Sequence, residues 1–206
     1  MRHHVAIQRS DELRAKFMAE VSLYDPSMLI WLDESGCDIR NTIRKYGYSM
    51  RGLPLCDQRL LVRGNRYSTI PIISLEGVHD VYIAEGCVNE DVFENFIDEC
   101  LLPILKPFNG SNPHSVVIMD NTSIHHVDRV SHLVETIAGA RLCYLPPYSP
   151  DLNPAEGVFS QVKNTMKMNN TLFEVTLAPR AILAMIFGMV TAENCYGHIS
   201  HCGYMN

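Results

Sequence analysis

The sequence of 206 residues lacks any long apolar run. Its longest uncharged apolar stretch, 181–192, is far shorter than the roughly 20 residues that a membrane-spanning helix needs. The first residues, 1–14, also lack the apolar core of a secretory signal peptide. Charged residues are too few, at 19% against 47% hydrophobic ones, for a disordered chain. These absences predict one folded domain, neither secreted nor inserted in a membrane.

The seven cysteines include no C-x-x-C pair, and their number is odd. This usage is typical of reduced thiols in a non-secreted protein. Four residues of types that bind zinc lie close together near the end of the chain: Cys195, His198, His201 and Cys202. Because their spacing is tighter than that of usual zinc fingers, we expect a coincidental grouping in a C-terminal tail rather than a zinc site.

Charge is distributed unevenly along the chain. The whole chain carries a net charge of −6, and this value taken alone argues against a nucleic-acid partner. Segment 67–105 contains eight acids and lacks lysine and arginine, whereas segment 40–66 has the single acid Asp57 and predicts a hairpin or loop. Its basic residues could bind the phosphates of a polyanion, or form ion pairs with the acidic segment; both interpretations stay open. These residues are Arg40, Arg44, Lys45, Arg51, Arg59, Arg63 and Arg66.

Apolar patterning predicts alternating strands and helices. Short apolar runs between turn residues predict strands at 28–32, 67–75, 78–84, 115–119 and 141–145. Helical spacing predicts helices at 1–24, 89–105, 127–137, 155–168 and 179–192. Segment 146–154 holds four prolines in nine residues and is expected to be irregular. The order predicts an α/β fold, with a central mixed sheet flanked by helices.

Three carboxylates stand at positions suited to chemistry. The strands LIWL and VVIM are followed directly by Asp33 and Asp120, and Glu156 opens a helix after the proline-rich segment. Each alone has an ordinary explanation, as a turn former or as an acid favoured in the first turn of a helix. If they converge, however, they form an oxygen-rich site that suits Mg²⁺ or Mn²⁺ rather than zinc. A bound cation would also allow all three to stay ionised.

Three phrases of the sequence carry a resemblance to a known family: LIWLDESG (29–36), VVIMDNTSIHH (116–126) and LPPYSPDLNPAEGVFSQVK (145–163). They resemble the catalytic domain of mariner-type and related insertion-sequence transposases, in the DDE superfamily of endonucleases. The 35 residues between Asp120 and Glu156 fall within the range of that family. The resemblance covers roughly 28–168 and 193–204. It implies a ribonuclease-H-like fold, with a catalytic domain at 28–175 between a helical extension, 1–27, and a C-terminal helix and tail, 176–206.

The resemblance also implies a mechanism and partners. Asp33, Asp120 and Glu156 would be the catalytic residues and would hold two Mg²⁺ or Mn²⁺ ions, which cut and join DNA by in-line displacement. Lys163 would contact a phosphate, although a solvated lysine on the helix surface explains it equally well. The seven basic residues of 40–66 would bind the DNA backbone. Supporting residues would be Asn121, His125, His126 and Asn153.

The sequence departs from the family pattern in two places. Ala155 and Gly157 replace a bulky aliphatic residue and an acid, and Gly157 weakens a helix by up to about 1 kcal/mol. The chain also begins only 32 residues before Asp33, too few for the helix-turn-helix modules that precede the catalytic domain in relatives. Recognition of specific transposon ends is therefore expected to be missing.

Two functions stay open at this stage. The first is an active, metal-dependent DNA endonuclease and strand-transfer domain, acting on transposon ends and target DNA, with a homodimer as one assembly and no small-molecule cofactor. The second is a silent transposon relic, or a domesticated module that binds DNA or protein. A phosphatase of the haloacid dehalogenase type is excluded because Ser35 stands where its second aspartate is needed. The expected location is the nucleus if the source is eukaryotic, and otherwise the cytoplasm.

Overall fold

The structure is a computed structural model, and it describes residues 9–37, 48–54, 66–120, 127–169 and 178–205. Its strands are β1 Leu29–Leu32, β2 Ser35–Cys37, β3 Tyr67–Ser74, β4 Gly77–Glu85, β5 Val116–Met119 and β6 Arg141–Tyr144. Its principal helices are α1 Asp11–Val21, α2 Glu90–Phe96, α3 Val127–Ser131, α4 Pro154–Met168, α6 Pro179–Gly188 and α7 Ala192–His201. Among these described residues, no helix is long and apolar enough to cross a membrane.

The six strands form one mixed sheet. Strands β1, β5 and β6 run parallel to one another, and β1 pairs antiparallel with β3. Strand β4 forms a hairpin with β3 and lies on the far edge of β3. The predicted mixed sheet with flanking helices is therefore confirmed. The short strand β2 was not predicted, because three residues around Gly36 carry no strand pattern of their own.

Strands β1 and β2 lie end to end along the same edge of β3, and the pairing is interrupted between them. The register pairs Leu32 with Ile72 and Ser35 with Thr69, so the position opposite Asp33 is Pro71. Proline has no backbone N–H and cannot donate to the neighbouring strand. The interruption falls at Asp33, where the site described below begins.

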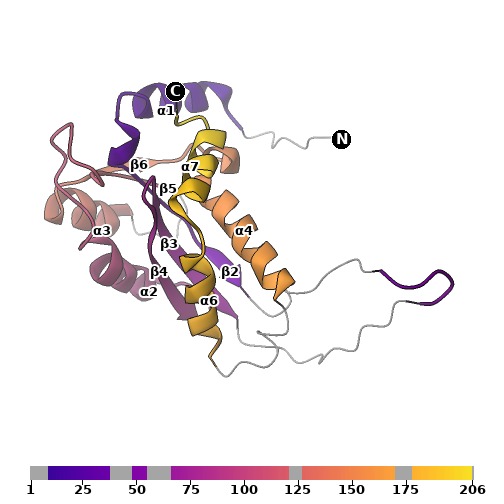
Figure 1. The fold of residues 1–206 in the computed structure, drawn as a ribbon. Helices are drawn as coiled ribbons and strands as arrows, with labels where there is room; N and C mark the ends of the chain where they lie inside the picture. The colour runs from indigo at the N-terminus through magenta and orange to yellow at the C-terminus, as the bar shows by residue number, and fades with distance from the viewer. Residues whose placement is uncertain (1–8, 38–47, 55–65, 121–126, 170–177, 206) are drawn as a thin grey trace.

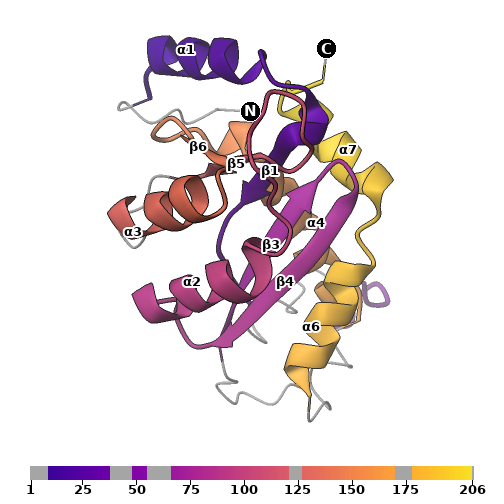
Figure 2. The ribbon, with the colours of Figure 1, turned by 90° about the vertical axis from the view of Figure 1, so that its left-hand side faces the viewer.

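Alternating side chains of the central strands form a core on each face of the sheet. Trp31 and Ile118 point to one face, where α4, α6 and α7 pack, whereas Leu32 and Met119 point to the other, covered by α2 and α3. Figures 1 and 2 show these two helical layers on opposite sides of the sheet. All residues of β1 and β5 are buried, which fixes the two strands firmly in the centre of the sheet.

Three predicted helices have different limits in the structure. Helix α1 begins after the N-cap Ser10 and ends at Val21, within the predicted range 1–24. Helix α2 begins after Asn89 as predicted, but its π-helical continuation ends at Leu101 rather than at residue 105, because Pro103 follows. Near the C-terminus, the predicted helix 179–192 ends at Gly188.

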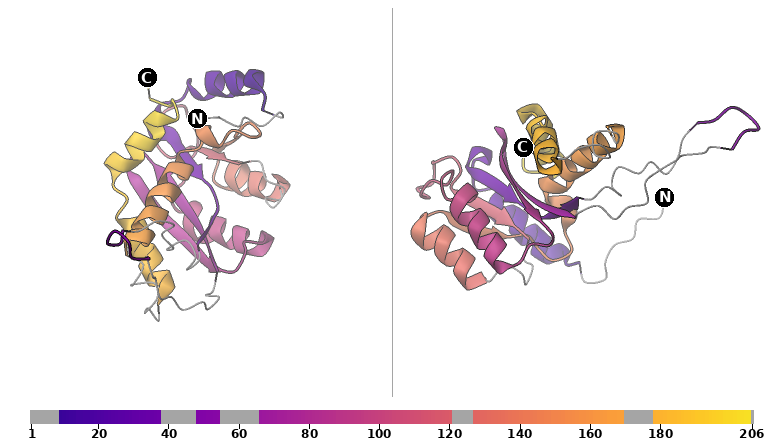
Figure 3. Two further views of the ribbon diagram at one scale, coloured as in Figure 1. Left: turned by 90° about the vertical axis from the view of Figure 1, so that its right-hand side faces the viewer. Right: turned by 90° about the horizontal axis from the view of Figure 1, so that it is seen from below.

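The C-terminal segment expected to be a tail is helical, so that prediction is wrong. Thr191 caps a new helix, α7: its side chain accepts a hydrogen bond from the backbone N–H of Asn194, and the Asn194 side chain accepts one in return. Cys195 and Ile199 of α7 are fully buried in the core beside α4. Helix α7 thus belongs to the layer that covers one face of the sheet, as Figure 3 shows.

Candidate active site

The three predicted carboxylates line one cleft. Asp33 follows β1 and Asp120 follows β5, and these parallel neighbours end side by side, with Leu32 opposite Met119. Glu156 stands in the first turn of α4. The cleft has a volume of about 500 Å³ and is completed by the segment 145–150. The structure therefore brings together side chains that are up to 123 positions apart in the sequence.

Asn153 connects two parts of this cleft. Its side-chain oxygen caps α4 by accepting a hydrogen bond from the backbone N–H of Ala155, at 3.1 Å. Its side-chain N–H₂ group donates to Oδ2 of Asp33, at 2.9 Å. The side chain is nearly buried, so both bonds are sheltered from water. Asn153 thereby fixes the start of α4, and with it Glu156, relative to the end of β1.

Asp33 is the carboxylate with a marked electrostatic perturbation. Burial raises its pKa from 3.8 to about 7, and the negative charges of Glu156 and Asp120 act in the same direction. A hydrogen bond of 2.7 Å from the backbone N–H of Glu34 partly opposes this rise in pKa. In the absence of a cation, the carboxyl group is therefore partly protonated near neutral pH. A cation in the cleft would favour the ionised form and would compete with this proton.

The donor set fits hard divalent ions. All three predicted ligands are carboxylates, and Mg²⁺ and Mn²⁺ prefer such oxygen ligands. Within the described part of the chain, the group of three ligand residues whose atoms all lie within 4.8 Å of one another is Glu76, His79 and His114, in another part of the fold. The three carboxylates of the cleft are therefore spread more widely than that.

Two further residues line the cleft and were missed from the sequence. Glu34, directly after Asp33, adds a fourth acid to the cleft. Tyr148, in the proline-rich segment, has a left-handed backbone (φ 56°), and 56% of its surface is exposed. Such a conformation is uncommon for a residue other than glycine. The signal for Glu34 was its adjacency to Asp33, whereas no pattern in the sequence marked Tyr148.

Lys163 is not the freely solvated lysine that one interpretation expected. Its ammonium group donates a hydrogen bond to the hydroxyl of Ser35 in β2, at 2.8 Å, and lies 5.7 Å from the ring centroid of Phe159. The lysine is half-buried, and Ser35 is buried. Lys163 therefore links α4 to β2 through Ser35, which lies two residues after Asp33. Contact with a DNA phosphate stays a prediction.

The basic segment is described only in part. Arg51 lies in an exposed turn within residues 48–54, which stand well away from the sheet and its helices (Figures 1 and 3). Arg66 is exposed directly before β3, with its guanidinium group beside Gly36 of β2. The other predicted site residues lie outside the described residues: Arg40, Arg44, Lys45, Arg59, Arg63, Asn121, His125 and His126.

Gly157 has a structural reason that the sequence did not reveal. A Cβ atom at this position would lie 2.4 Å from Nδ1 of His198 in α7, far inside contact distance. The other ring nitrogen of His198 contacts Gln161 at 3.1 Å, and Gln161 donates to Asn194 at 2.9 Å. Glycine therefore allows α4 and α7 to approach closely. The ring of His198 contacts α4, whereas Cys195 of the same helix is buried in the core. Within the part of the chain that the structure describes, Cys195, His198, His201 and Cys202 do not form a group of ligand atoms within 4.8 Å of one another.

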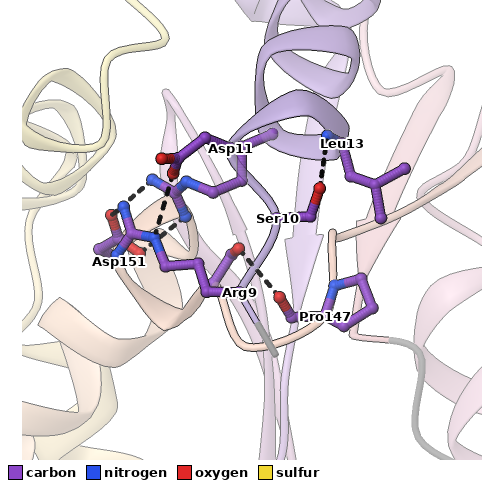
Figure 4. A network of polar contacts seen from close by, with 8 residues as sticks. Arg9, Ser10, Asp11, Leu13, Pro147 and Asp151 are labelled. Atoms are coloured by element: carbon purple, nitrogen blue, oxygen red, sulfur yellow. Dashed lines mark hydrogen bonds and ion pairs between the residues drawn. The ribbon is translucent and has the colours of Figure 1, made fainter. Parts of the chain in front are cut away.

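The N-terminal helix also supports the loop that leads to Glu156. Arg14 of α1 forms two parallel hydrogen bonds with the carboxylate of Asp151, at 2.9 and 2.7 Å. Arg9 lies 3.6 Å from the same carboxylate, and Figure 4 shows these two residues side by side. Partial burial would raise the pKa of Asp151, but the bonds and charge of Arg14, with the charge of Arg9, outweigh it and lower the pKa. Asp151 lies two residues before Asn153, so α1 holds the segment that orients the cap of α4.

The fold and the cleft define a class of protein: a mixed α/β domain with acidic side chains at the carboxyl ends of its central parallel strands. The sequence model of the DDE superfamily endonuclease family matches residues 28–175. The chain belongs to this family, as the resemblance in its sequence predicted. Comparison with curated proteins gives no match.

Solved structures with the same fold come from the Mos1 transposase. The chain is similar to the Mos1 strand transfer complex (TM-score 0.69, 18% identity, 96% of this chain and 59% of that one). It is similar to the Mos1 mariner paired end complex with Mn (TM-score 0.64, 18% identity, 97% of this chain and 62% of that one). It is also similar to the catalytic domain of Mos1 mariner transposase (TM-score 0.59, 13% identity, 97% of this chain and 91% of that one).

These likenesses confirm the predicted ribonuclease-H-like fold. At such low identity they bear on the fold alone. The chain spans about three fifths of the length of the Mos1 chains in the strand transfer and paired end complexes.

Proposed function

We propose that this chain is a transposase catalytic domain that cuts and joins DNA phosphodiester bonds with divalent metal ions. The observation that carries the proposal is the single cleft lined by Asp33, Asp120 and Glu156, at the carboxyl ends of two central strands. Membership of the DDE superfamily endonuclease family supports it. The likeness to a Mos1 paired end complex with Mn supports divalent metal and DNA as partners.

In this proposal, the three carboxylates hold two Mg²⁺ or Mn²⁺ ions. When bound, such ions activate the attacking water or 3′-hydroxyl group and stabilise the leaving oxygen. The chain supplies the placement of the ligands: Asp33 and Asp120 come from rigid buried strands, and Asn153 holds Oδ2 of Asp33 in a fixed orientation. Glu156, on the more exposed side, completes the ligand set from α4.

DNA is the proposed substrate. Arg51, Arg66 and Lys163 are the described members of the basic set that we place against its phosphates, because clustered positive charge favours phosphate contact. The same proposal includes four further predictions. Asp33, Asp120 and Glu156 are the catalytic residues, the catalytic domain covers 28–175, the chain forms a homodimer, and it is located in the nucleus or the cytoplasm.

The first experiment measures nicking of supercoiled plasmid DNA with Mn²⁺ or Mg²⁺. The unmodified chain is expected to nick the plasmid only with metal. Asp120→Ala is expected to reduce the rate by about 1,000-fold or more, since each 1.36 kcal/mol of lost transition-state stabilisation costs tenfold. Asp98→Ala, which removes an exposed acid outside the cleft, should leave the rate unchanged. No nicking at any metal concentration would instead support the silent relic.

A second prediction concerns Asn153, whose amide contacts Asp33 and caps α4. Asn153→Ala removes both bonds. It is expected to lower the nicking rate by about 10–100-fold, the usual cost of losing a group that orients a metal ligand. It should also lower the free energy of unfolding by about 1 kcal/mol through the lost cap.

The control separates these two effects. Asn153→Ser keeps a capping oxygen but cannot reach Asp33 with an amide, so it should recover most of the stability and little of the activity. Equal nicking by Asn153→Ser and the unmodified chain would contradict the role assigned to the Asn153–Asp33 bond.

A further inference from the structure

A second cluster of metal-ligand side chains lies outside the acidic cleft. Glu76 stands in the turn between β3 and β4, His79 near the start of β4, and His114 in the segment directly before β5. Each offers one ligand atom, and these atoms all lie within 4.8 Å of one another. Nε2 of His114 is 3.7 Å from Oε2 of Glu76, and the two imidazole rings meet edge to face, with centroids 4.6 Å apart.

The separations are close to those of a zinc site. With bonds of about 2.0–2.2 Å in a tetrahedron, neighbouring ligand atoms stand roughly 3.3–3.5 Å apart. The distance from His114 to Glu76 is already within a few tenths of an ångström of this value. The Glu76 side chain is 68% exposed and can rotate to close the remaining gap. Closing the gap between Glu76 and His114 therefore needs movement of one flexible side chain.

The two histidines are held in place before any ion binds. The hydroxyl of Ser74 contacts Nε2 of His79 at 2.6 Å and accepts a hydrogen bond from the backbone N–H of Glu76 at 3.0 Å. His114 is buried and has a left-handed backbone, with φ 54°. Its backbone N–H donates to the carbonyl of Ser27 at 3.2 Å. Strained conformations of this kind are found at ligand sites, where surrounding contacts maintain them.

The electrostatic surroundings are compatible with neutral imidazole ligands. Burial lowers the pKa of both His79 and His114, against the opposing effect of the Glu76 carboxylate. The charge of Lys106 also lowers the pKa of His114, and it disfavours a cation. Glu76 supplies the negative charge that offsets Lys106 when a divalent ion binds.

We propose that Glu76, His79 and His114 form a zinc site that is separate from the acidic cleft. Two imidazoles and one carboxylate suit zinc, with water in the fourth position, whereas Mg²⁺ prefers oxygen ligands. His114 precedes β5 and Asp120 follows it, so the two sites lie at opposite ends of that strand, roughly 20 Å apart at 3.3 Å per residue. The ion would fasten the β3–β4 turn to the entry of β5.

The test uses the full chain without a histidine tag, with Asp33→Asn introduced to weaken the acidic cleft. Zn²⁺ is titrated against a competing chromophoric chelator, with thermal unfolding as a second readout. The expected result is one equivalent of bound zinc and a rise in Tm of about 5–10 °C at a free zinc concentration a hundredfold above Kd. Co²⁺ in place of zinc should give a visible spectrum without the charge-transfer band of thiolate ligands.

Glu76→Gln and His79→Gln are each expected to weaken zinc binding by more than about 100-fold. Replacing a residue that only orients a metal ligand already lowers metal affinity by about 10–100-fold, and the loss of a ligand itself should cost more. Glu76 is exposed, so its variant tests binding without threatening the fold. His201→Gln, at an exposed histidine of α7, is the matched control and should bind zinc normally. Undiminished zinc binding in both variants, or no binding by the parent chain, would overturn the proposal.

Plasmid nicking measured in His79→Gln alone, with Asp33 restored, tests the proposed function independently.

Discussion

Replacing Asp33 by asparagine is expected to abolish metal-dependent nicking and, at the same time, to stabilise the metal-free protein above pH 7. Loss of nicking follows from the proposed ligand role, because a neutral amide is a much weaker ligand for Mg²⁺ and Mn²⁺ than a carboxylate. The gain in stability follows from the burial of the carboxylate, which makes its charge unfavourable in the folded state.

The sign of the pH effect follows from the two pKa values. In the folded chain the pKa of Asp33 is about 7, above its ordinary value of 3.8. Between these values the folded state keeps a proton that the unfolded state has lost, so the free energy of unfolding falls as pH rises. The full difference corresponds to about 4 kcal/mol above pH 7.

The asparagine variant should recover only part of this free energy. Asp33 accepts hydrogen bonds on both oxygens, from Glu34 and Asn153, and an amide has a single acceptor oxygen. One donor is then left unpaired, at a cost of about 1–3 kcal/mol. We therefore expect a net gain of about 1–3 kcal/mol at pH 8, and a loss at pH 4, where Asp33 is protonated.

Thermal unfolding at pH 4 to 8, with and without Mn²⁺, checks the change in stability, and the plasmid-nicking assay checks the loss of activity. Mn²⁺ should raise the Tm of the unmodified chain at pH 8 and leave that of Asp33→Asn almost unchanged. Asp98→Asn, at an exposed position, should behave as the unmodified chain. A variant that is less stable at pH 8 than the unmodified chain would contradict the burial argument.

Gly157→Ala is expected to destabilise the chain, although alanine is the better helix former. The exchange alone should favour helix α4 by up to about 1 kcal/mol. The added Cβ, however, would lie 2.4 Å from Nδ1 and 2.8 Å from Cγ of His198, so the whole ring must move and lose its contact with Gln161. Overpacking of this kind costs about 1–3 kcal/mol, which leaves a net loss of up to about 2 kcal/mol after the helix gain and a fall in Tm of up to roughly 4–8 °C.

Two matched variants test this steric explanation. Gly157→Ala combined with His198→Ala should be more stable than the sum of the two single changes, because the clash is absent. Gly197→Ala, in α7, gains the same helix propensity and meets nothing within 4 Å, so its Tm should rise slightly. A fall in Tm for Gly197→Ala equal to that of Gly157→Ala would show that loss of glycine itself, rather than His198, is responsible.

The central strands and the positions of the three acids could be predicted because they are local features. The runs that form β1 and β5 are apolar throughout and end directly at Asp33 and Asp120. The cap at Asn153 is also local, since it acts on the next turn of the chain. Patterns of this kind are set by burial and by capping within a few residues.

The contacts that decide the geometry of the cleft could not be predicted. The bond from Asn153 to Asp33 joins residues 120 positions apart, and the close approach at Gly157 depends on where α7 packs. Strand β2 exists because β3 offers it a pairing edge. Helix α7 was mistaken for a tail because its capping residues, Thr191 and Asn194, are a weaker start signal than the usual Ser or Thr with Glu or Gln.

The bond from Asn153 to Asp33 has a consequence for the order of folding. The loop that it closes spans 120 residues, so this contact carries a large entropic cost and should form after the local hairpin and helices. On the ribosome, both aspartates emerge well before α4. The proposed ligand set is therefore incomplete until α4, which carries Glu156, has left the exit tunnel. A nascent chain that has not yet released α4 would be unable to cut DNA.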